Sequence, residues 1–489
     1  MNPAYEHGGS QDRGFPSLSR RQFIELAAIG TAGMAAAPLF AEDTGRRGRR
    51  SQQHRGGPSG VFKTDVPDRL ADFILGRPTH TSMTLSILAH QSCEVALRYR
   101  GETDAESESL DVRPRAVNAG GVAEIQLTNL RPDTAYAYEA RLSPHGGVAS
   151  SRHGTFRTAR PPGAAFTFTM TADSHLDENT EPSIYAATLR NALADKPDFH
   201  IDLGDTFMTG KRRDDPEAAL PQYLAQSYYF GLLCHSAPLF LALGNHDGEF
   251  GRRMDAAYRM RTTYFPNPMP DGFYTGSRNE NYYAWDWGDA LFVVLDPFRY
   301  SQRPRHGEDT DNWWFTLGRP QYDWLKEKLA RSAARFKFVF IHHLVGGRDR
   351  QARGGAEAVP YFEWGGRDLD GKDVFDAKRP GWGLPIHALL VKHGVTAVFH
   401  GHDHFYAKQE VDGIVYQLVP QPGHRGDGSI REARNYGYLD GDLVPGSGYL
   451  RVSVSSADTT IDFVRTARAG KPELAHRYSL AGQNQGGTP

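Results

Sequence analysis

Aspartate, histidine and asparagine side chains gather in five short stretches of the sequence. These stretches are Asp173-Ser174-His175, Gly204-Asp205, Gly244-Asn245-His246-Asp247, His342-His343 and Gly401-His402-Asp403-His404. Imidazole, carboxylate and amide groups suit Mn, Fe or Zn better than Ca. One Gly-Asp or His-x-His pair arises often by chance, but five such stretches, each after an apolar run, predict one metal centre.

The amino-acid composition excludes some kinds of metal site and of partner. The chain has 489 residues, 20 histidines and only two cysteines, Cys93 and Cys234, so thiolate metal sites and a disulfide framework are excluded. The formal net charge is −2, which removes the usual argument for nucleic acid or an anionic membrane as the main partner. At roughly 150 residues per domain, the length indicates two or three domains.

Runs of β-forming residues precede the polar stretches. They cover 165–171, 199–203, 238–243, 290–295, 336–341 and 395–399. Helical segments such as 321–330 alternate with these runs, which is typical of an α/β domain. In such domains ligands bind at the carboxyl ends of the strands. The expected strands therefore place all five polar stretches where a binding site is expected.

The pattern is different before residue 158. Apolar and polar residues alternate in short runs, for example at Met83, Leu85 and Ile87, which predicts an all-β sandwich. The segments 130–138 and 154–158 resemble a fibronectin type III-like domain, similar to the one that precedes the catalytic domain of purple acid phosphatases. We expect this domain to cover 61–158, to pack against the next domain and to shape one wall of a cleft.

The N-terminus resembles a twin-arginine signal peptide. The segment Ser19-Arg20-Arg21-Gln22-Phe23-Ile24 precedes an apolar stretch of small residues that ends near Ala41. This stretch is shorter than the roughly 20 residues that span a bilayer, so we expect a removable signal over 1–41 rather than a membrane anchor. A flexible linker over 42–60 and a C-terminal tail over 468–489 complete the expected organisation.

Together, the five stretches resemble the motifs of calcineurin-like metallophosphoesterases: D-x-H, G-D, G-N-H-[DE], a strand-end histidine and G-H-x-H. The match runs from about Phe166 to Val464. It implies a four-layer α/β/β/α sandwich of two mixed sheets over 165–467, with two metal ions in a cleft.

The resemblance also implies a ligand set. Asp173, His175 and His404 would hold one ion, Asn245, His342 and His402 the other, and Asp205 would bridge them. We expect two divalent transition-metal ions, Mn, Fe or Zn. Two such cations can share a water, lower its pKa and hold the phosphate, so that a bridging hydroxide attacks phosphorus.

Two catalytic residues are expected beside the ligands. His246 would assist the leaving group, and Asp247 would orient the His246 ring. His342 and His343 point to opposite faces of a strand; the family motif favours His342 as the ligand, and His343 would meet substrate or pack. His400 is expected to have a supporting or buried role.

Two positions depart from purple acid phosphatases. Those enzymes have glycine at the position of His175 and tyrosine at the position of Met208. Without the tyrosine phenolate we expect two divalent ions and no purple absorption band.

Some residues outside the metal motifs are candidates for contact with the substrate. Arg348, Arg350 and His424 could reach a substrate phosphate or be solvated loop residues. The long insertions 248–283 and 346–383 could form pocket walls, with aromatics such as Tyr361 and Trp364 that either stack on a substrate or form satellite cores.

These features predict an exported hydrolase acting on phosphomonoesters. A phosphodiesterase on the same site is the close alternative, and a secreted binding protein with an inactive metal domain is the remote one. The expected partners are a small phosphoester and the twin-arginine translocation machinery, without stable nucleic-acid binding or a mature membrane anchor. The expected location is the periplasm or outside the cell.

Overall fold

The computed structural model describes residues 62–102, 110–212, 216–250, 254–278, 280–302, 311–349, 351–467 and 469–482. The predicted signal segment, 1–41, and the predicted linker, 42–60, lie outside the described residues. Within these ranges, no helix has both the length and the apolar character needed to cross a bilayer.

Two antiparallel sheets form the β-rich region before residue 158. Their strands are β1 (Ala71–Gly76), β2 (Met83–Ala89), β3 (Cys93–Gly101), β4 (Leu110–Val117), β5 (Val122–Leu127), β6 (Ala135–Pro144) and β7 (Ser150–Arg157). One sheet has the order β1-β2-β5 and the other β4-β3-β6-β7. Leu85 and Ile87 of β2 share a buried core with Val95 and Leu97 of β3, so the predicted all-β sandwich is confirmed.

A six-stranded mixed sheet follows. Its strands are β8 (Phe166–Thr171), β9 (Phe199–Asp202), β10 (Leu239–Leu241), β19 (Gly448–Val454), β20 (Asp458–Thr466) and β21 (Pro472–Ala481). The order is β10-β9-β8-β19-β20-β21. β8, β9 and β10 run parallel, and the other neighbours are antiparallel.

The second mixed sheet has eight strands. They are β11 (Thr275–Gly276), β12 (Tyr283–Trp287), β13 (Ala290–Val294), β14 (Phe336–Phe340), β15 (Ala397–His400), β16 (Tyr406–Val411), β17 (Ile414–Leu418) and β18 (Asp442–Val444). The order is β11-β12-β13-β14-β15-β17-β16-β18. Its centre, from β13 through β14 and β15 to β17, is parallel.

An aromatic core joins the two mixed sheets. Phe168 of β8 lies 5.2 Å from Phe292 of β13 and 6.0 Å from Phe338 of β14, between ring centroids. Burying such rings stabilises a sheet-on-sheet interface through both area and ring geometry.

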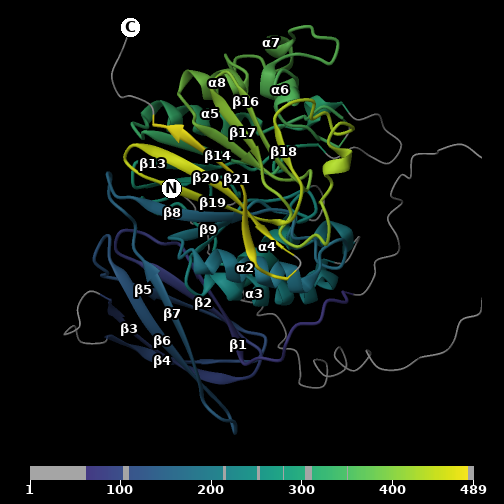
Figure 1. The fold of residues 1–489 in the computed structure, drawn as a ribbon. Helices are drawn as coiled ribbons and strands as arrows, with labels where there is room; N and C mark the ends of the chain where they lie inside the picture. The colour runs from purple at the N-terminus through teal and green to yellow at the C-terminus, as the bar shows by residue number, and fades with distance from the viewer. Residues whose placement is uncertain are drawn as a thin grey trace, which may run out of the picture. The chain divides into compact units, whose positions relative to one another are not determined.

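Helices cover the outer faces and complete four layers (Figure 1). α2 (Pro182–Ala194) and α3 (Leu220–Cys234) pack on the six-stranded sheet. α5 (Gly318–Arg331) and α8 (Ile386–Lys392) pack on the eight-stranded sheet. Shorter helices are α4 (Met254–Tyr264), α6 (Phe362–Gly365) and α7 (Phe375–Lys378). The predicted layering is therefore confirmed.

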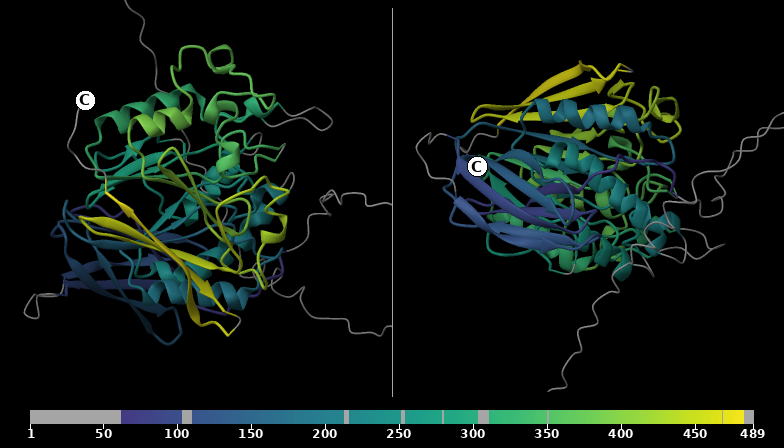
Figure 2. Two further views of the ribbon diagram at one scale, coloured as in Figure 1. Left: turned by 45° about the horizontal axis from the view of Figure 1, so that its top comes forward. Right: turned by 90° about the horizontal axis from the view of Figure 1, so that it is seen from below.

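The expected C-terminal tail is wrong for residues 472–481. They form β21, which pairs with β20 along its whole length with one irregularity beside Phe463 and Val464. Figure 2 shows these strands in yellow as part of the sheet. β21 is an edge strand in which only Ala475, Tyr478 and Leu480 pack on the core, so its apolar pattern is weak.

The β-sandwich packs against α3, as expected. The Tyr138 hydroxyl donates a hydrogen bond to the His235 carbonyl (2.8 Å), and Arg152 Nη2 donates to the Gly231 carbonyl (3.2 Å). Ile74 of β1 also belongs to the apolar cluster that α3 shares with the six-stranded sheet.

Candidate metal centre

The five polar stretches lie in loops that follow β8, β9, β10, β14 and β15, at the carboxyl ends of parallel strands. There the structure brings acidic and imidazole ligand atoms into two groups, each within 4.8 Å. One group is Asp173, His175, Asp205 and His404; the other is Asp205, His342 and His402. Asn245 lies beside the second group, with Oδ1 3.1 Å from His342 Nε2. The structure thus gathers all seven predicted ligands, and Asp205 belongs to both groups.

The ligand loops have an unusual backbone. Asp173, His175, Asp205, His402 and His404 all have positive φ, between 38° and 79°. L-residues with side chains adopt this left-handed region rarely and at some cost. The cost lets each strand end turn sharply and present its side chain to a common centre.

Two motif glycines permit the loops to touch. A Cβ on Gly244 would overlap the backbone nitrogen and Oδ1 of Asp205. A Cβ on Gly401 would lie 2.7 Å from Oδ2 of Asp173. The glycines of the G-N-H-D and G-H-D-H stretches are therefore required by close approach of the carboxylates.

Each central carboxylate uses one oxygen to anchor itself and leaves the other toward the centre. Asp205 Oδ1 accepts from the His246 amide (2.7 Å), while Oδ2 lies 3.2 Å from His175 Nε2 and 3.4 Å from His342 Nε2. Asp173 Oδ2 accepts from the His402 amide (2.8 Å). Both carboxylates are thus fixed by backbone N–H groups.

Backbone carbonyls set the proton position on two imidazoles. His342 Nδ1 lies 2.8 Å from the Leu203 carbonyl, and His402 Nε2 lies 2.7 Å from the Gln351 carbonyl. A carbonyl oxygen only accepts, so these nitrogens donate. In the neutral rings the opposite nitrogens, His342 Nε2 and His402 Nδ1, are then free of protons, as metal ligands must be.

The arrangement fits a pair of metal ions. Asp173 Oδ1 is buried and accepts no hydrogen bond within the described part of the chain, which is costly unless a cation compensates it. Its surroundings are imidazoles, a second carboxylate and an amide, the donor set that Mn, Fe and Zn accept. The shared Asp205 makes the predicted dinuclear centre consistent with the geometry.

The buried carboxylates of the cluster change the pKa values of the neighbouring histidines. Burial disfavours protonated imidazole, yet the hydrogen bonds and charges of neighbouring carboxylates raise the pKa of His175 to about 10 and that of His342 to about 9. Although burial opposes ionisation, the attraction of the protonated forms of His246 and His342 holds the pKa of Asp205 well below its usual value. The negative charges of the buried carboxylates must therefore be compensated, either by protons on the imidazoles or by metal ions.

The two predicted catalytic residues have different surroundings. His246 lines the cavity, with a 28% exposed side chain and Nε2 3.8 Å from Asp205 Oδ2. Burial lowers the pKa of His246 to about 4, despite the attraction of Asp205, so the ring is neutral near pH 7.

Asp247 does not perform the predicted role of orienting the His246 ring. Its carboxylate accepts four backbone hydrogen bonds of 2.7 to 3.0 Å, from the amides of Asp205, Thr206, Phe207 and Gly244. A buried carboxylate among four amide donors has no oxygen to spare for a neighbouring ring. Asp247 instead holds the Asp205 loop.

His343 and His400 are not predicted ligands, and their surroundings agree with the roles expected for them. His343 lines the cavity and packs edge-on against Phe315, with ring centroids 5.5 Å apart. Its Nδ1 lies 3.1 Å from the Leu344 carbonyl. His400 is buried, and burial lowers its pKa to about 4.

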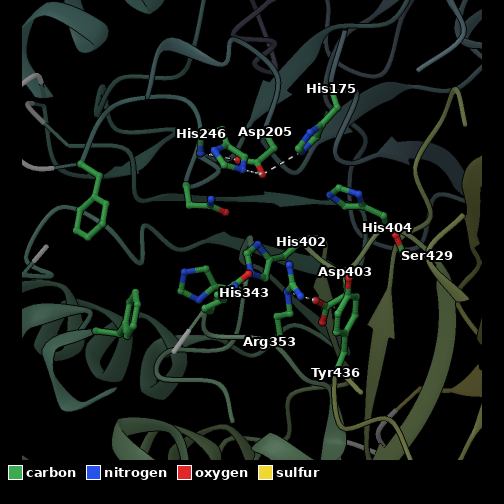
Figure 3. Close-up of a pocket in the computed structure, with 14 residues that line it drawn as sticks. His175, Asp205, His246, His343, Arg353, His402, Asp403, His404, Ser429 and Tyr436 are labelled. Carbon is green, nitrogen blue, oxygen red and sulfur yellow. Dashed lines mark hydrogen bonds and ion pairs between the residues drawn. The ribbon is translucent and has the colours of Figure 1, made fainter. Parts of the chain in front are cut away.

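A cavity of about 340 Å³ opens on the cluster (Figure 3). Away from the predicted ligands its wall contains Phe250, Phe315, Arg353, Ser429 and Tyr436. Among the described residues, none before His175 lines it, so the expected contribution of the β-sandwich to a cleft wall is not met in this cavity.

The predicted substrate contacts are not in this wall. Arg348 lies 5.8 Å from the Tyr361 ring centroid, and His424 Nδ1 accepts from the amides of Gly426 and Gly428; neither lines the cavity. Arg350 lies outside the described residues. Among the described residues, the arginine that lines the cavity is Arg353, a few residues further along the same loop. The sequence does not distinguish it from Arg348 and Arg350.

The insertion aromatics pack rather than line the cavity. Tyr274, Trp364 and Trp382 are each less than 7% exposed and belong to apolar clusters. Glu363 is buried and accepts hydrogen bonds from Thr316 and Leu317. For these three aromatic residues the satellite-core interpretation is therefore the better one.

Comparison with known proteins identifies a family for part of the chain and solved structures that share its fold. Residues 166–406 match the family described as calcineurin-like phosphoesterase. No curated protein sequence matches the chain. Among solved structures, PhoD is 15% identical, with a TM-score of 0.60 over 86% of this chain and 95% of the other. Purple acid phosphatase PPD1 from yellow lupin (Lupinus luteus) seeds is 12% identical, with a TM-score of 0.57 over 84% and 74%. These structural likenesses show a shared fold.

Proposed function

Residues 166–406 form a calcineurin-like phosphoesterase domain, and from this premise we propose that the chain is an exported, metal-dependent phosphomonoesterase. That it is a hydrolase of phosphoric esters follows from the family. The substrate class, the metals and export are the proposed parts.

The observation that carries the proposal is the position of Asp205. Its Oδ2 faces both His175 Nε2 and His342 Nε2, one from each ligand group, at 3.2 and 3.4 Å. A carboxylate shared in this way suits two adjacent divalent cations.

The residues divide between two ions. Asp173, His175 and His404 would hold one ion, Asn245, His342 and His402 the other, and Asp205 both. Such a pair supplies positive charge for phosphoryl oxygens and makes water more acidic. Asp247 keeps the shared carboxylate in place through the amides of its loop.

The leaving alcohol needs its own assistance. His246 lines the cavity beside Asp205, and its ring is neutral near pH 7. A neutral ring N–H can donate a hydrogen bond to the oxygen on which negative charge develops.

The donor set supports divalent ions. His175 and buried Met208 stand where purple acid phosphatases have glycine and tyrosine, so no phenolate is contributed at the Met208 position. We therefore expect Mn, Fe or Zn without a purple charge-transfer band. A visible absorption maximum from the iron-loaded enzyme would contradict this expectation.

The size of the cavity supports a small phosphoester. About 340 Å³ is at the lower end of the roughly 300–1,000 Å³ of ligand pockets. Protein loaded separately with Mn, Zn or Fe is offered p-nitrophenyl phosphate and bis(p-nitrophenyl) phosphate. Turnover of the monoester alone supports the proposal, comparable turnover of the diester supports a phosphodiesterase, and turnover of neither with any metal supports a binding protein. Asp205→Ala should abolish whatever activity is seen.

Export rests on the N-terminal sequence. We propose that Arg20 and Arg21 direct the chain to the twin-arginine route, and so to the periplasm or the medium. Replacing both with lysine should leave the unprocessed chain in the cytoplasm, whereas replacing Arg46 and Arg47 of the predicted linker should not. Export of the Arg20/Arg21 variant at the normal level would refute the route.

A further inference from the structure

Among the described residues, Arg353 has a buried hydrogen-bond donor without a partner. It lines the cavity, and this donor is its Nε. Its nearest carboxylate oxygen, Asp403 Oδ1, lies 3.8 Å from Nε, beyond hydrogen-bonding distance. A guanidinium has five N–H donors. A hydrogen bond from Nε to Asp403 would use only one of them.

The guanidinium is nonetheless held in place. Its carbon lies 4.0 Å from the centroid of the Tyr436 ring, a contact that orients a guanidinium without occupying its N–H groups. Asp403 is itself fixed, because its Oδ2 accepts from Tyr438 Oη (2.8 Å) and the Gly354 amide (3.1 Å).

The loop backbone adds to this preorganisation. The Arg353 amide donates to Asp349 Oδ1 (3.0 Å), and its carbonyl accepts from the Arg348 amide (2.7 Å). The same loop supplies the Gln351 carbonyl that accepts from His402. Arg353 is therefore tied to the metal cluster through a short, hydrogen-bonded segment.

Arg353 lies on one side of the ligand cluster, next to His402. In Figure 3, His175, Asp205 and His246 lie together, and Arg353 lies beyond His402 from them, beside Asp403 and Tyr436. Two metal ions would already compensate the charge of the scissile phosphate. An additional fixed cation beside His402, on the side away from His175 and His246, suits a second negative group of the substrate.

We propose that Arg353 is a specificity-determining residue that binds an anionic group on the alcohol portion of the substrate. The preferred substrates are then phosphomonoesters whose alcohol also bears a carboxylate or a second phosphate, since both present paired oxygens to a guanidinium. This inference rests on the proposed phosphomonoesterase function.

The kinetic test compares two primary-alcohol esters that differ in one carboxylate, 3-phosphoglycerate and glycerol 3-phosphate. The metal-loaded enzyme should have the higher kcat/KM for 3-phosphoglycerate. In Arg353→Gln the ratio of the two kcat/KM values should fall about 10- to 100-fold, as expected for loss of a hydrogen bond between charged groups. Arg348→Gln, in the same loop but outside the cavity, should keep the wild-type ratio. Equal losses for both substrates in Arg353→Gln would overturn the proposal, because Arg353 would then act on the scissile phosphate.

A binding measurement separates this proposal from the proposed function. Calorimetry with 3-phosphonopropionate and propylphosphonate requires no turnover and can be done on the wild-type holoprotein, so it does not depend on the folding of a variant. The proposal predicts at least about 10-fold tighter binding of the carboxylated phosphonate; equal affinities would overturn it. Absence of phosphatase turnover, together with this preference in wild type and its loss in Arg353→Gln, would reject the proposed function but retain the anion-binding role of Arg353.

Discussion

Glu178 and His175 form a carboxylate–imidazole pair at the edge of the candidate metal centre. Glu178 Oε2 lies 2.9 Å from His175 Nδ1, and the other ring nitrogen, Nε2, faces Asp205 Oδ2 at 3.2 Å. Pairs of this kind fix the ring and its proton while leaving the second nitrogen for a metal. Although burial opposes ionisation, the hydrogen bond and charge of His175 lower the pKa of Glu178 to about 2, so the carboxylate is charged at neutral pH.

Replacing Glu178 should therefore weaken metal binding without removing a ligand. Glu178→Ala is expected to lose about 10- to 100-fold in affinity at one of the two sites, measured by metal titration of the apoprotein. Glu181→Ala is the control, because Glu181 pairs with Arg425 rather than with a predicted ligand. Wild-type affinity in Glu178→Ala would show that the pair has no role in metal binding.

Metal binding should release protons. In the metal-free protein the pKa of His175 is raised to about 10 and that of His342 to about 9, so both rings are protonated at pH 7 and must lose that proton to bind a metal. About two protons per chain should be released, and the affinity should rise with pH up to these values. Calorimetry in buffers of different ionisation enthalpy counts them; an affinity that does not change between pH 6 and pH 8 would contradict the assignment.

His246 should matter most for poor leaving groups. If its ring N–H supports the departing oxygen, His246→Gln should lower kcat about 100-fold for an alkyl phosphate and much less for p-nitrophenyl phosphate, whose phenolate leaves readily. A parallel loss for both substrates would place His246 in phosphate binding instead. The metal content of the variant should equal that of wild type.

Gly244 should tolerate no side chain. A Cβ there would overlap the backbone and Oδ1 of Asp205, whereas a Cβ on Gly231 of α3 would have its nearest neighbour at 3.8 Å. Gly244→Ala is expected to displace Asp205 and lose both activity and metal, and Gly231→Ala to retain them. Full activity in Gly244→Ala would mean that the two loops are not packed as the structure shows.

The sequence predicts which polar side chains come together because each polar stretch follows an apolar strand. β8, β9, β10, β14 and β15 end just before the polar stretches, and parallel strands bring such ends together. The left-handed backbone at Asp173 and His404 carries no comparable signal, because it results from packing between loops rather than from local preference.

The cavity wall is harder to predict. Arg353 and Tyr436 are 83 residues apart in segments without periodic pattern, and they meet because the loop after β14 packs beside the segment between β17 and β18. Asp247 shows the same limit: its type indicates a carboxylate near His246, but only the folded loop reveals that backbone amides occupy both its oxygens.

The metal content of the purified protein tests the central claim that Asp205 is shared by two metal ions. Elemental analysis after saturation with Mn or Zn and removal of unbound metal should give about two ions per chain in wild type, and fewer in Asp205→Ala with its fold intact. One ion or none in wild type, or two tightly bound ions in Asp205→Ala, would contradict the account.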